Sequence, residues 1–212
     1  MKLVSASFLG TKDELATIDK FNKSSVDFIH FDVMDGTLVE KVHLLPEEIA
    51  PYLNACQKKI DIHLMVDAPS SYLEVLKDYA ISYVTLHLEI PNFKDQLKLF
   101  KERGFNVGIS IKPDTALENV FPFLEEVSLV LVMSVNPGAS GQQFFKGTKE
   151  RLAKLKQEIQ KRALPVKISV DGGICQTVLE DVDDADILVS SSYILQDLSN
   201  NVAILKNNIE II

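Results

Sequence analysis

The chain has 212 residues, of which 46% are hydrophobic and 25% are charged, the balance of a folded globular protein with a sizeable core. Its formal net charge is -8 and it contains no run of Lys and Arg, which argues against nucleic-acid binding because phosphate backbones require clustered positive charge. The longest apolar runs, such as residues 129–135, are much shorter than the roughly 18 residues that suggest a membrane span. Without a signal-peptide pattern, the chain is expected to be cytoplasmic and to bind no membrane.

Two further properties bear on the class of protein. Cys56 and Cys175 are far apart in a chain without secretory signals, so we expect reduced thiols rather than a disulfide. Cys175 comes shortly after two glycines and could be reactive, although an inert thiol is the commoner case. The acidic charge leaves a small anionic substrate open, because backbone N–H groups and helix N-termini bind anions without Lys or Arg.

Short apolar runs alternate with longer amphipathic stretches, which is typical of repeated βα units around a parallel sheet. Eight runs are predicted to be strands, most of them continuously apolar as parallel strands covered on both faces are: residues 2–7, 27–33, 59–65, 83–88, 106–111, 129–135, 166–170 and 185–190. We therefore predict a single α/β domain over residues 1–212, a (β/α)8 TIM barrel. An open doubly wound sheet is the alternative that counting leaves open.

Helices are predicted between the strands from their start and stop signals. Three pairs of residues match the capping box, in which a hydroxyl and a carboxylate satisfy free backbone donors: Thr11 and Glu14, Ser71 and Glu74, and Thr115 and Glu118. Pro46 and Pro69 suit a first helical turn, where the missing N–H costs nothing. Gly104 is expected to end a helix over residues 92–103.

Polar residues at the ends of apolar strands carry the functional signal, because the carboxyl ends of barrel strands open into one mouth. His30 and Asp32 lie two apart at the end of the second strand and so share a face, which Met34 continues. His63 ends the third strand and Asp171 ends the seventh. Two imidazoles and two carboxylates are thus expected to converge.

Such a cluster needs a partner, because buried imidazole and carboxylate groups are costly unless they are paired or bind a metal. One divalent cation is the simplest candidate, and two nitrogen and two oxygen donors suit Zn2+, Fe2+, Mn2+ or Co2+ better than Ca2+ or Mg2+. For His63 taken alone, a hydrogen-bonded core residue is an equal alternative. His87 ends the fourth strand and is expected to line the mouth or hold a loop rather than bind the ion, and His43 is expected to be solvated in a loop.

Glycine- and serine-rich turns follow the last three predicted strands. They are Asn136-Pro-Gly-Ala-Ser-Gly141, Gly172-Gly173 and Ser190-Ser-Ser192, the last just before a short possible helix. Glycines let the backbone approach a ligand closely, so successive N–H groups there are expected to bind a phosphate. At three strand ends, Met34, Met65 and Met133 either cap the reacting carbons of a substrate or simply fill gaps.

Taken together, these segments resemble the ribulose-phosphate 3-epimerase family, from residue 7 to about residue 192. The resemblance lies in His30-Phe-Asp-Val-Met-Asp-Gly36, Asp61-Ile-His-Leu-Met65, Val132-Met-Ser-Val-Asn-Pro-Gly138, Gly141-Gln142 and Val170-Asp-Gly-Gly173. It implies a sugar-phosphate-binding TIM barrel and a homo-oligomer. It also implies His30, Asp32, His63 and Asp171 as ligands of a divalent metal, with Asp32 and Asp171 as acid and base on opposite faces of the substrate.

The resemblance further implies Ser7 as a substrate-binding residue, the methionine cap of Met34, Met65 and Met133, and the phosphate-site positions Gly138, Ala139, Ser140, Gly141, Ser191 and Ser192. With His63 and the glycine turn Gly172-Gly173, these are the predicted substrate-binding residues. The chain departs from the family pattern in several places. It reads Thr37-Leu-Val-Glu-Lys41 where the family usually has His-Phe-Val-Pro-Asn, Ala139-Ser140 for Phe-Gly, Ser191 for a common Gly, and Tyr193 for a small residue.

The expected activity is metal-dependent C3 epimerisation of a ketose phosphate in carbohydrate metabolism, with D-ribulose 5-phosphate and D-xylulose 5-phosphate as the leading pair. The same chemistry on a six-carbon sugar such as D-allulose 6-phosphate is the closest alternative. A non-catalytic sugar-phosphate binder is less favoured, because a binder needs no pair of opposed proton carriers. A barrel decarboxylase or aldolase would typically need a Lys among the carboxylates, where this chain has His.

Overall fold

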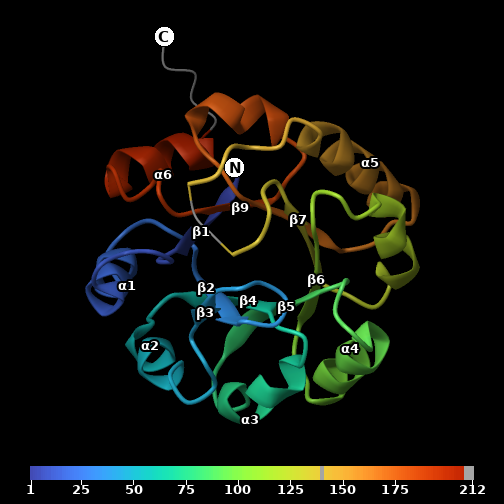
Figure 1. The fold of residues 1–212 in the computed structure, drawn as a ribbon. Coiled ribbons are helices and arrows are strands. Elements are labelled where there is room, and N and C mark those ends of the chain that lie inside the picture. Colours follow the sequence, from blue (N-terminus) through green and yellow to red (C-terminus); the bar gives the residue numbers. More distant parts are fainter. Residues whose placement is uncertain (139–140, 208–212) are drawn as a thin grey trace.

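Eight parallel strands close into a barrel in the computed structural model, which describes residues 1–138 and 141–207 (Figure 1). The strands are β1 Leu3–Ser7, β2 Phe28–Asp35, β4 Lys59–Met65, β5 Ile81–His87, β6 Val107–Ile111, β7 Leu129–Met133, β8 Lys167–Asp171 and β9 Ile187–Ser190. Each overlaps one predicted run, so the eight strand predictions are confirmed. Because β1 pairs in parallel with both β2 and β9, the sheet has no free edge there and the open-sheet alternative is wrong.

A ninth, two-residue strand was not predicted. β3 Val42–His43 pairs antiparallel with the end of β2, placing His43 opposite Met34 and Val42 opposite Asp35. The side chain of His43 is only 12% exposed and contacts Glu14 and the backbone of Asp32. The expectation of a solvated loop histidine is therefore wrong, because the chain after β2 folds back onto the strand it has just left.

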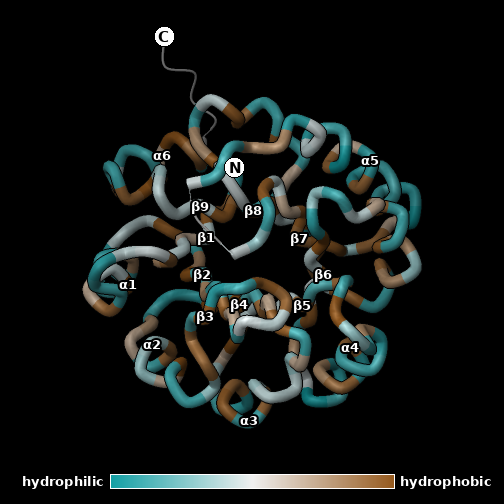
Figure 2. Tube along the Cα trace, viewed as in Figure 1, coloured by the Kyte–Doolittle hydropathy of each residue, from teal (hydrophilic) through white to brown (hydrophobic). Residues whose placement is uncertain are grey.

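The helices form an outer ring around the strands (Figure 1). They are α1 Glu14–Asn22, α2 Ala50–Ala55, α3 Leu73–Leu76, α4 Phe93–Glu102, α5 Thr148–Lys161 and α6 Leu198–Asn207, with 3-10 helices over Pro69–Tyr72, Leu117–Phe123 and Gln176–Asp181. Hydrophilic residues gather on the outer rim, over α4 and α5, while hydrophobic residues are frequent along the inner strands such as β7 (Figure 2). Within the described ranges, none of these helices has the length and apolar character needed to cross a membrane.

The three predicted capping boxes are wrong because the hydroxyls donate elsewhere. Thr11 donates to the carbonyl oxygen of Phe8, and α1 is capped by Asp13, whose carboxylate accepts the N–H of Ala16. Ser71 likewise donates to the carbonyl oxygen of Ala68, and Thr115 donates to Glu89. Short hydroxyl side chains have nearby acceptors in turns, and these compete with the capping role.

Other boundary signals have mixed outcomes. Pro69 begins a 3-10 helix, and Gly104, with φ of 82°, follows the C-cap residue Arg103 of α4, as predicted. Pro46 does not begin a helix, because it lies in a turn and α2 starts only at Ala50.

Side chains alternate along each strand between the barrel interior and the surrounding helices. Residues such as Phe31, Ile62 and Leu64 face the helices and are fully buried in the main core. The interior has an apolar sector and a polar sector. A cluster of Phe28, Leu129, Leu131, Met133, Val135, Ile187 and Val189 forms the first, and buried polar residues form the second: Ser5, Ser7, His30, Asp32, Asp61, His63, Thr85, His87, Ser110 and Ser169. The second sector contains the candidate site.

Candidate active site and metal centre

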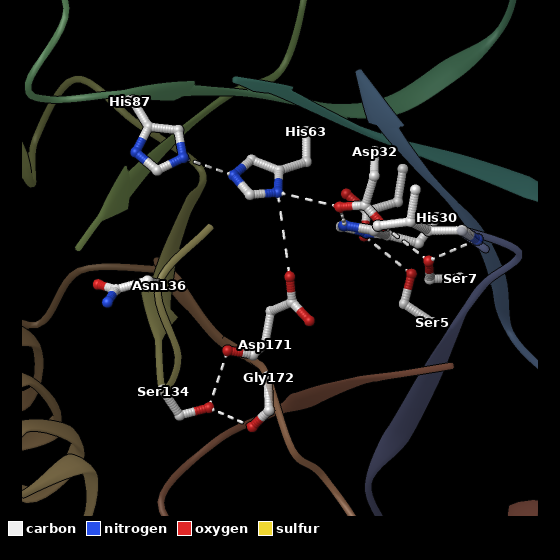
Figure 3. A network of polar contacts seen from close by, with 12 residues as sticks. Ser5, Ser7, His30, Asp32, His63, His87, Ser134, Asn136, Asp171 and Gly172 are labelled. Atoms are coloured by element: carbon white, nitrogen blue, oxygen red, sulfur yellow. Dashed lines mark hydrogen bonds and ion pairs between the residues drawn. The ribbon is translucent and has the colours of Figure 1, made fainter. Parts of the chain in front are cut away.

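Two imidazoles and two carboxylates converge at the carboxyl ends of β2, β4 and β8 (Figure 3). His30, Asp32, His63 and Asp171 each offer one potential ligand atom, and these atoms all lie within 4.8 Å of one another. Oδ1 of Asp32 lies 3.4 Å from Nε2 of His30 and 3.4 Å from Nδ1 of His63. Nδ1 of His63 also lies 4.0 Å from Oδ2 of Asp171. The convergence expected from the strand ends is therefore confirmed.

The donor set fits a metal ion. Nε2 of His30 and Nδ1 of His63 are buried and have no hydrogen-bond partner. Leaving a buried nitrogen unpaired is costly, so these two atoms call for a further partner. A cation among the four ligand atoms, with metal–ligand distances of about 2.0–2.2 Å, would engage both. The group could thus hold a divalent metal, whose identity the donor types do not specify.

The remaining nitrogen of His30 is held by a residue that the sequence interpretation left without a role. Nδ1 of His30 lies 2.8 Å from Oδ2 of Asp61, which also accepts a hydrogen bond from Oγ of Ser5 at 2.8 Å. A carboxylate on the outer nitrogen orients an imidazole and directs its other nitrogen toward a metal. Asp61 lies two residues before His63 and therefore on the same face of β4, a signal that was present in the sequence.

The electrostatics of the two acids of the cluster differ. Burial alone would raise the pKa of Asp32, but charge and hydrogen bonding from His30, and then His63, outweigh it and hold the pKa well below its usual range. Burial, with the charge of Asp32 next, raises the pKa of Asp171 to about 7. Without a cation, one acid is therefore ionised near neutral pH while the other is partly protonated, an arrangement suited to a base and an acid.

The pKa values of His30 and His63 are shifted in opposite directions. Burial would lower the pKa of His30, yet the charges of Asp32 and Asp61 outweigh it and raise that pKa well above its usual value. For His63 burial dominates and lowers the pKa to about 4. His63 is therefore neutral near pH 7, as a metal-binding imidazole must be, while His30 must release a proton when it binds an ion.

Serine side chains fix both acids. Oγ of Ser7, at the end of β1, donates to Oδ2 of Asp32 at 2.7 Å. Oγ of Ser134 lies 2.8 Å from the carbonyl oxygen of Asp171 and 2.6 Å from that of Gly172 (Figure 3). Ser134 was not singled out from the sequence, because a serine in Val132-Met-Ser-Val gives no sign that it holds a strand end 37 residues away.

A cavity opens beside the two acids. It is lined by most of the predicted substrate-binding residues, namely Ser7, Met65, Met133, Gly138, Gly141, Gly172, Gly173, Ser191 and Ser192, together with Asp32 and Asp171. Leu9 also lines it and was not predicted. Asn136, from the predicted phosphate-binding turn, and Gln142, from the family segment Gly141-Gln142, line it too. The predicted His63 and Met34 are not part of the lining, and Met34 packs with Leu9 and Met65. The predicted Ala139 and Ser140 lie outside the described residues.

The two glycines after β8 are required by close packing. A Cβ at Gly172 would lie 2.4 Å from Cγ2 of Val135, and φ there is 115°. At Gly173, φ is 66° and a Cβ would lie 3.0 Å from the carbonyl oxygen of Gln142. Both glycines of this turn line the cavity. The short helix expected after Ser192 is wrong, because turns lead from there to α6.

Comparisons with known proteins give the family of this chain. The profile of the ribulose-phosphate 3 epimerase family matches residues 1–195. The chain belongs to this family. One relative, the ribulose-phosphate 3-epimerase of Helicobacter pylori strain J99, is 33% identical over 205 residues. The match covers 95% of this chain and 92% of the relative. The ribulose-phosphate 3-epimerase of Treponema pallidum is 36% identical over 202 residues, covering 90% and 87%.

Solved structures support the fold of this epimerase-family chain. A tryptophan synthase structure from Mycobacterium tuberculosis superposes with a TM-score of 0.66 at 12% sequence identity, covering 97% of this chain and 88% of the other. Identity this low supports the barrel fold alone. The enzyme class rests on the family match and on the full-length relatives.

Proposed function

We propose that this chain interconverts D-ribulose 5-phosphate and D-xylulose 5-phosphate by inverting C3, with Asp32 and Asp171 as the two proton carriers. The observation that carries the proposal is that these carboxylates reach one nitrogen, Nδ1 of His63, from strands separated by β1 and β9. Two acids that meet over one cavity can act on the same carbon from different sides. Family membership supplies the reaction class.

Inversion requires two proton carriers because a single base would return the proton to the face it came from. Asp32, with a lowered pKa, is the ionised group ready to accept the C3 proton. Asp171, with a pKa raised to about 7, can hold the proton that is delivered to the opposite face. The C–H bond breaks on one face and a new C–H bond forms on the other, and the two acids exchange roles in the reverse reaction.

His30, Asp32, His63 and Asp171 would hold a divalent cation such as Zn2+, Fe2+, Mn2+ or Co2+. A cation bound there would supply Lewis-acid stabilisation of the negative charge that develops on the substrate oxygens. The protein contributes the fixed orientation of its ligands. Ser7 holds the carboxylate of Asp32, and Asp61 holds the imidazole of His30.

The substrate phosphate would bind at the far side of the cavity, where Gly138, Gly141, Gly173, Ser191 and Ser192 line it. Backbone N–H groups in such glycine-rich turns attract an anion without a charged side chain. Ser7, Met65 and Met133 would contact the sugar, whereas the position of Met34 supports a packing role beneath Met65.

The segment after Gly36, which differs from the family pattern, bears on sugar length. A Cβ at Gly138 would lie 3.3 Å from Cβ of Val39, so this segment packs directly against the proposed phosphate turn. The same chemistry on a six-carbon ketose phosphate is therefore the alternative. Comparison of kcat/KM for ribulose 5-phosphate and allulose 6-phosphate would separate the two substrates.

The proposal is tested by turnover in D2O. We expect metal-loaded protein to convert ribulose 5-phosphate to xylulose 5-phosphate with deuterium at C3, and a chelator to abolish both conversion and labelling. A protein that binds the sugar phosphate but labels neither epimer would be a binder rather than an epimerase. Labelling without inversion would leave Asp32 or Asp171 without its proposed role.

A further inference from the structure

A chain of polar side chains leads away from His63 on the side opposite the cluster. Nε2 of His63 lies 2.8 Å from Nε2 of His87, the last residue of β5 (Figure 3). Nδ1 of His87 lies 3.0 Å from Oε2 of Glu89. Both imidazoles are fully buried, and the side chain of Glu89 is 19% exposed. The proposed reaction uses neither His87 nor Glu89 directly.

The carboxylate of Glu89 is held firmly in place. Its Oε1 accepts the backbone N–H of Lys112 at 2.8 Å and the hydroxyl of Thr115. The loop with these two donors is fixed by the guanidinium of Arg151 on α5, which donates to three of its carbonyl oxygens: Lys112 at 3.0 Å, Pro113 at 2.9 Å and Thr115 at 2.7 Å. Burial would raise the pKa of Glu89, but hydrogen bonds from His87, Lys112 and Thr115 outweigh it and lower the pKa to about 2.

An ionised carboxylate only accepts hydrogen bonds, and this decides which ring nitrogens of His87 and His63 carry a hydrogen. Nδ1 of His87 must carry a hydrogen to donate to Glu89. In a neutral imidazole the other nitrogen is then an acceptor, so Nε2 of His63 must carry the hydrogen between the rings. The hydrogen-free nitrogen of His63 is consequently Nδ1, the buried atom without a hydrogen-bond partner that faces Asp32 and Asp171.

We propose that Glu89, acting through His87, is a positioning residue that fixes the tautomer of His63 and presents its Nδ1 lone pair to the metal centre. The inference deepens the proposed function and rests on His63 as a metal ligand. Asp32 favours the opposite tautomer, since a hydrogen on Nδ1 would point toward its carboxylate, but that separation is 3.4 Å against 2.8 and 3.0 Å along the chain from Glu89. The shorter contacts, from Glu89 to His87 and from His87 to His63, therefore determine which nitrogen of His63 carries the hydrogen.

The variant Glu89→Gln reverses the expected donor and acceptor roles in the His63–His87–Glu89 contacts while it keeps the shape of the side chain. Lys112 and Thr115 both donate to Oε1, so the amide oxygen of glutamine takes that place and its NH2 group faces His87. Nδ1 of His87 then becomes an acceptor, Nε2 of His87 carries the hydrogen, and the hydrogen of His63 moves to Nδ1. The substitution thus blocks the ligand atom without removing a side chain from the cluster.

The first measurement is 15N NMR of the imidazoles in metal-free protein, which contains only four histidines. We expect His63 to carry its hydrogen on Nε2 and His87 on Nδ1 in the wild type, and both assignments to reverse in Glu89→Gln. Thr115→Val removes one hydrogen bond to Glu89 but leaves its carboxylate, so both tautomers should stay as in the wild type. A wild-type His63 protonated on Nδ1, a doubly protonated His87, or no change in Glu89→Gln would overturn the proposal.

The second measurement is Zn2+ affinity by competition with a coloured chelator. We expect Glu89→Gln to bind Zn2+ roughly 10- to 100-fold more weakly than the wild type, the loss typical when a group behind a metal ligand is altered. Glu125→Gln, at an exposed position, removes the same charge and should bind Zn2+ like the wild type. Equal affinity in Glu89→Gln would contradict the inference. A wild type that binds no metal would instead refute the metal centre, while the NMR result would still decide the tautomer.

Discussion

Nδ1 of His43 lies 2.6 Å from the backbone carbonyl oxygen of Asp32, so β3 contacts the backbone of the proposed base. Nε2 of the same imidazole lies 2.9 Å from Oε1 of Glu14 on α1. The base is therefore connected through His43 to a helix in the outer ring.

Removing this connection should cost stability. We expect His43→Ala to lower the free energy of unfolding by about 1–3 kcal/mol, because partners in a half-buried site lose their hydrogen bonds. Urea denaturation of the metal-free protein provides the measurement. Val42→Ala, in the same strand but at a residue that is 54% exposed, should change stability by about 0.5 kcal/mol or less. Equal effects of the two substitutions would contradict a specific role for His43.

The two proposed proton carriers should fail in complementary ways. We expect Asp171→Asn to lower the rate of inversion by about 10^2- to 10^4-fold, the usual contribution of a positioned acid or base. Asp32 can still remove the C3 proton from its own side, so this variant should still replace the C3 hydrogen of one epimer with deuterium. Asp32→Asn should lose inversion as well and retain exchange only in the other epimer. Proton NMR of both sugars in D2O measures the exchange at C3, and the metal content of each variant is determined as a control. Exchange in the same epimer for both variants would refute the opposed roles of Asp32 and Asp171.

Removal of the metal should make stability depend on pH through Asp171. Burial, then Asp32, raises the pKa of Asp171 to about 7 in the folded protein, against an ordinary value of 3.8. The contribution of this group to stability is therefore complete below about pH 4 and is lost as the pH rises through 7. In the presence of chelator we expect Asp171→Asn to raise the Tm by several degrees at pH 8 and by less at pH 5. An equal shift at both values, or a lower Tm for Asp171→Asn at pH 8, would contradict the raised pKa.

Gly172 should tolerate no side chain. Both its φ of 115° and the 2.4 Å contact between a Cβ and Val135 oppose substitution, so we expect Gly172→Ala to cost more than the ~1–3 kcal/mol of an unfavourable backbone conformation alone. Gly104→Ala is the matched control, since φ is 82° there but a Cβ meets nothing within 4 Å. Combining Gly172→Ala with Val135→Ala should recover part of the loss. A smaller effect for Gly172→Ala than for Gly104→Ala in urea denaturation would show that Val135 yields easily.

The sequence by itself determined the barrel strands and which strand ends carry the chemistry. Parallel strands are buried on both faces, so their apolar runs stand out, and the two-residue period placed His30 and Asp32 on one face without knowledge of any neighbour. The same period placed Asp61 beside His63, although its role became evident only from its 2.8 Å contact with His30. Family resemblance supplied the rest of the site.

Only the tertiary structure decided which polar groups pair between neighbouring strands and their loops. Ser134 with Asp171, His87 with His63, and Thr115 with Glu89 are contacts over 37, 24 and 26 residues. No local spacing encodes such pairs, because strand register and loop path set them. Thr115 illustrates the limit: its hydroxyl lies where a capping box would predict a helix start, yet it donates to a carboxylate from another loop. Local rules describe the options of a side chain, and the partner that folding brings nearest selects among them.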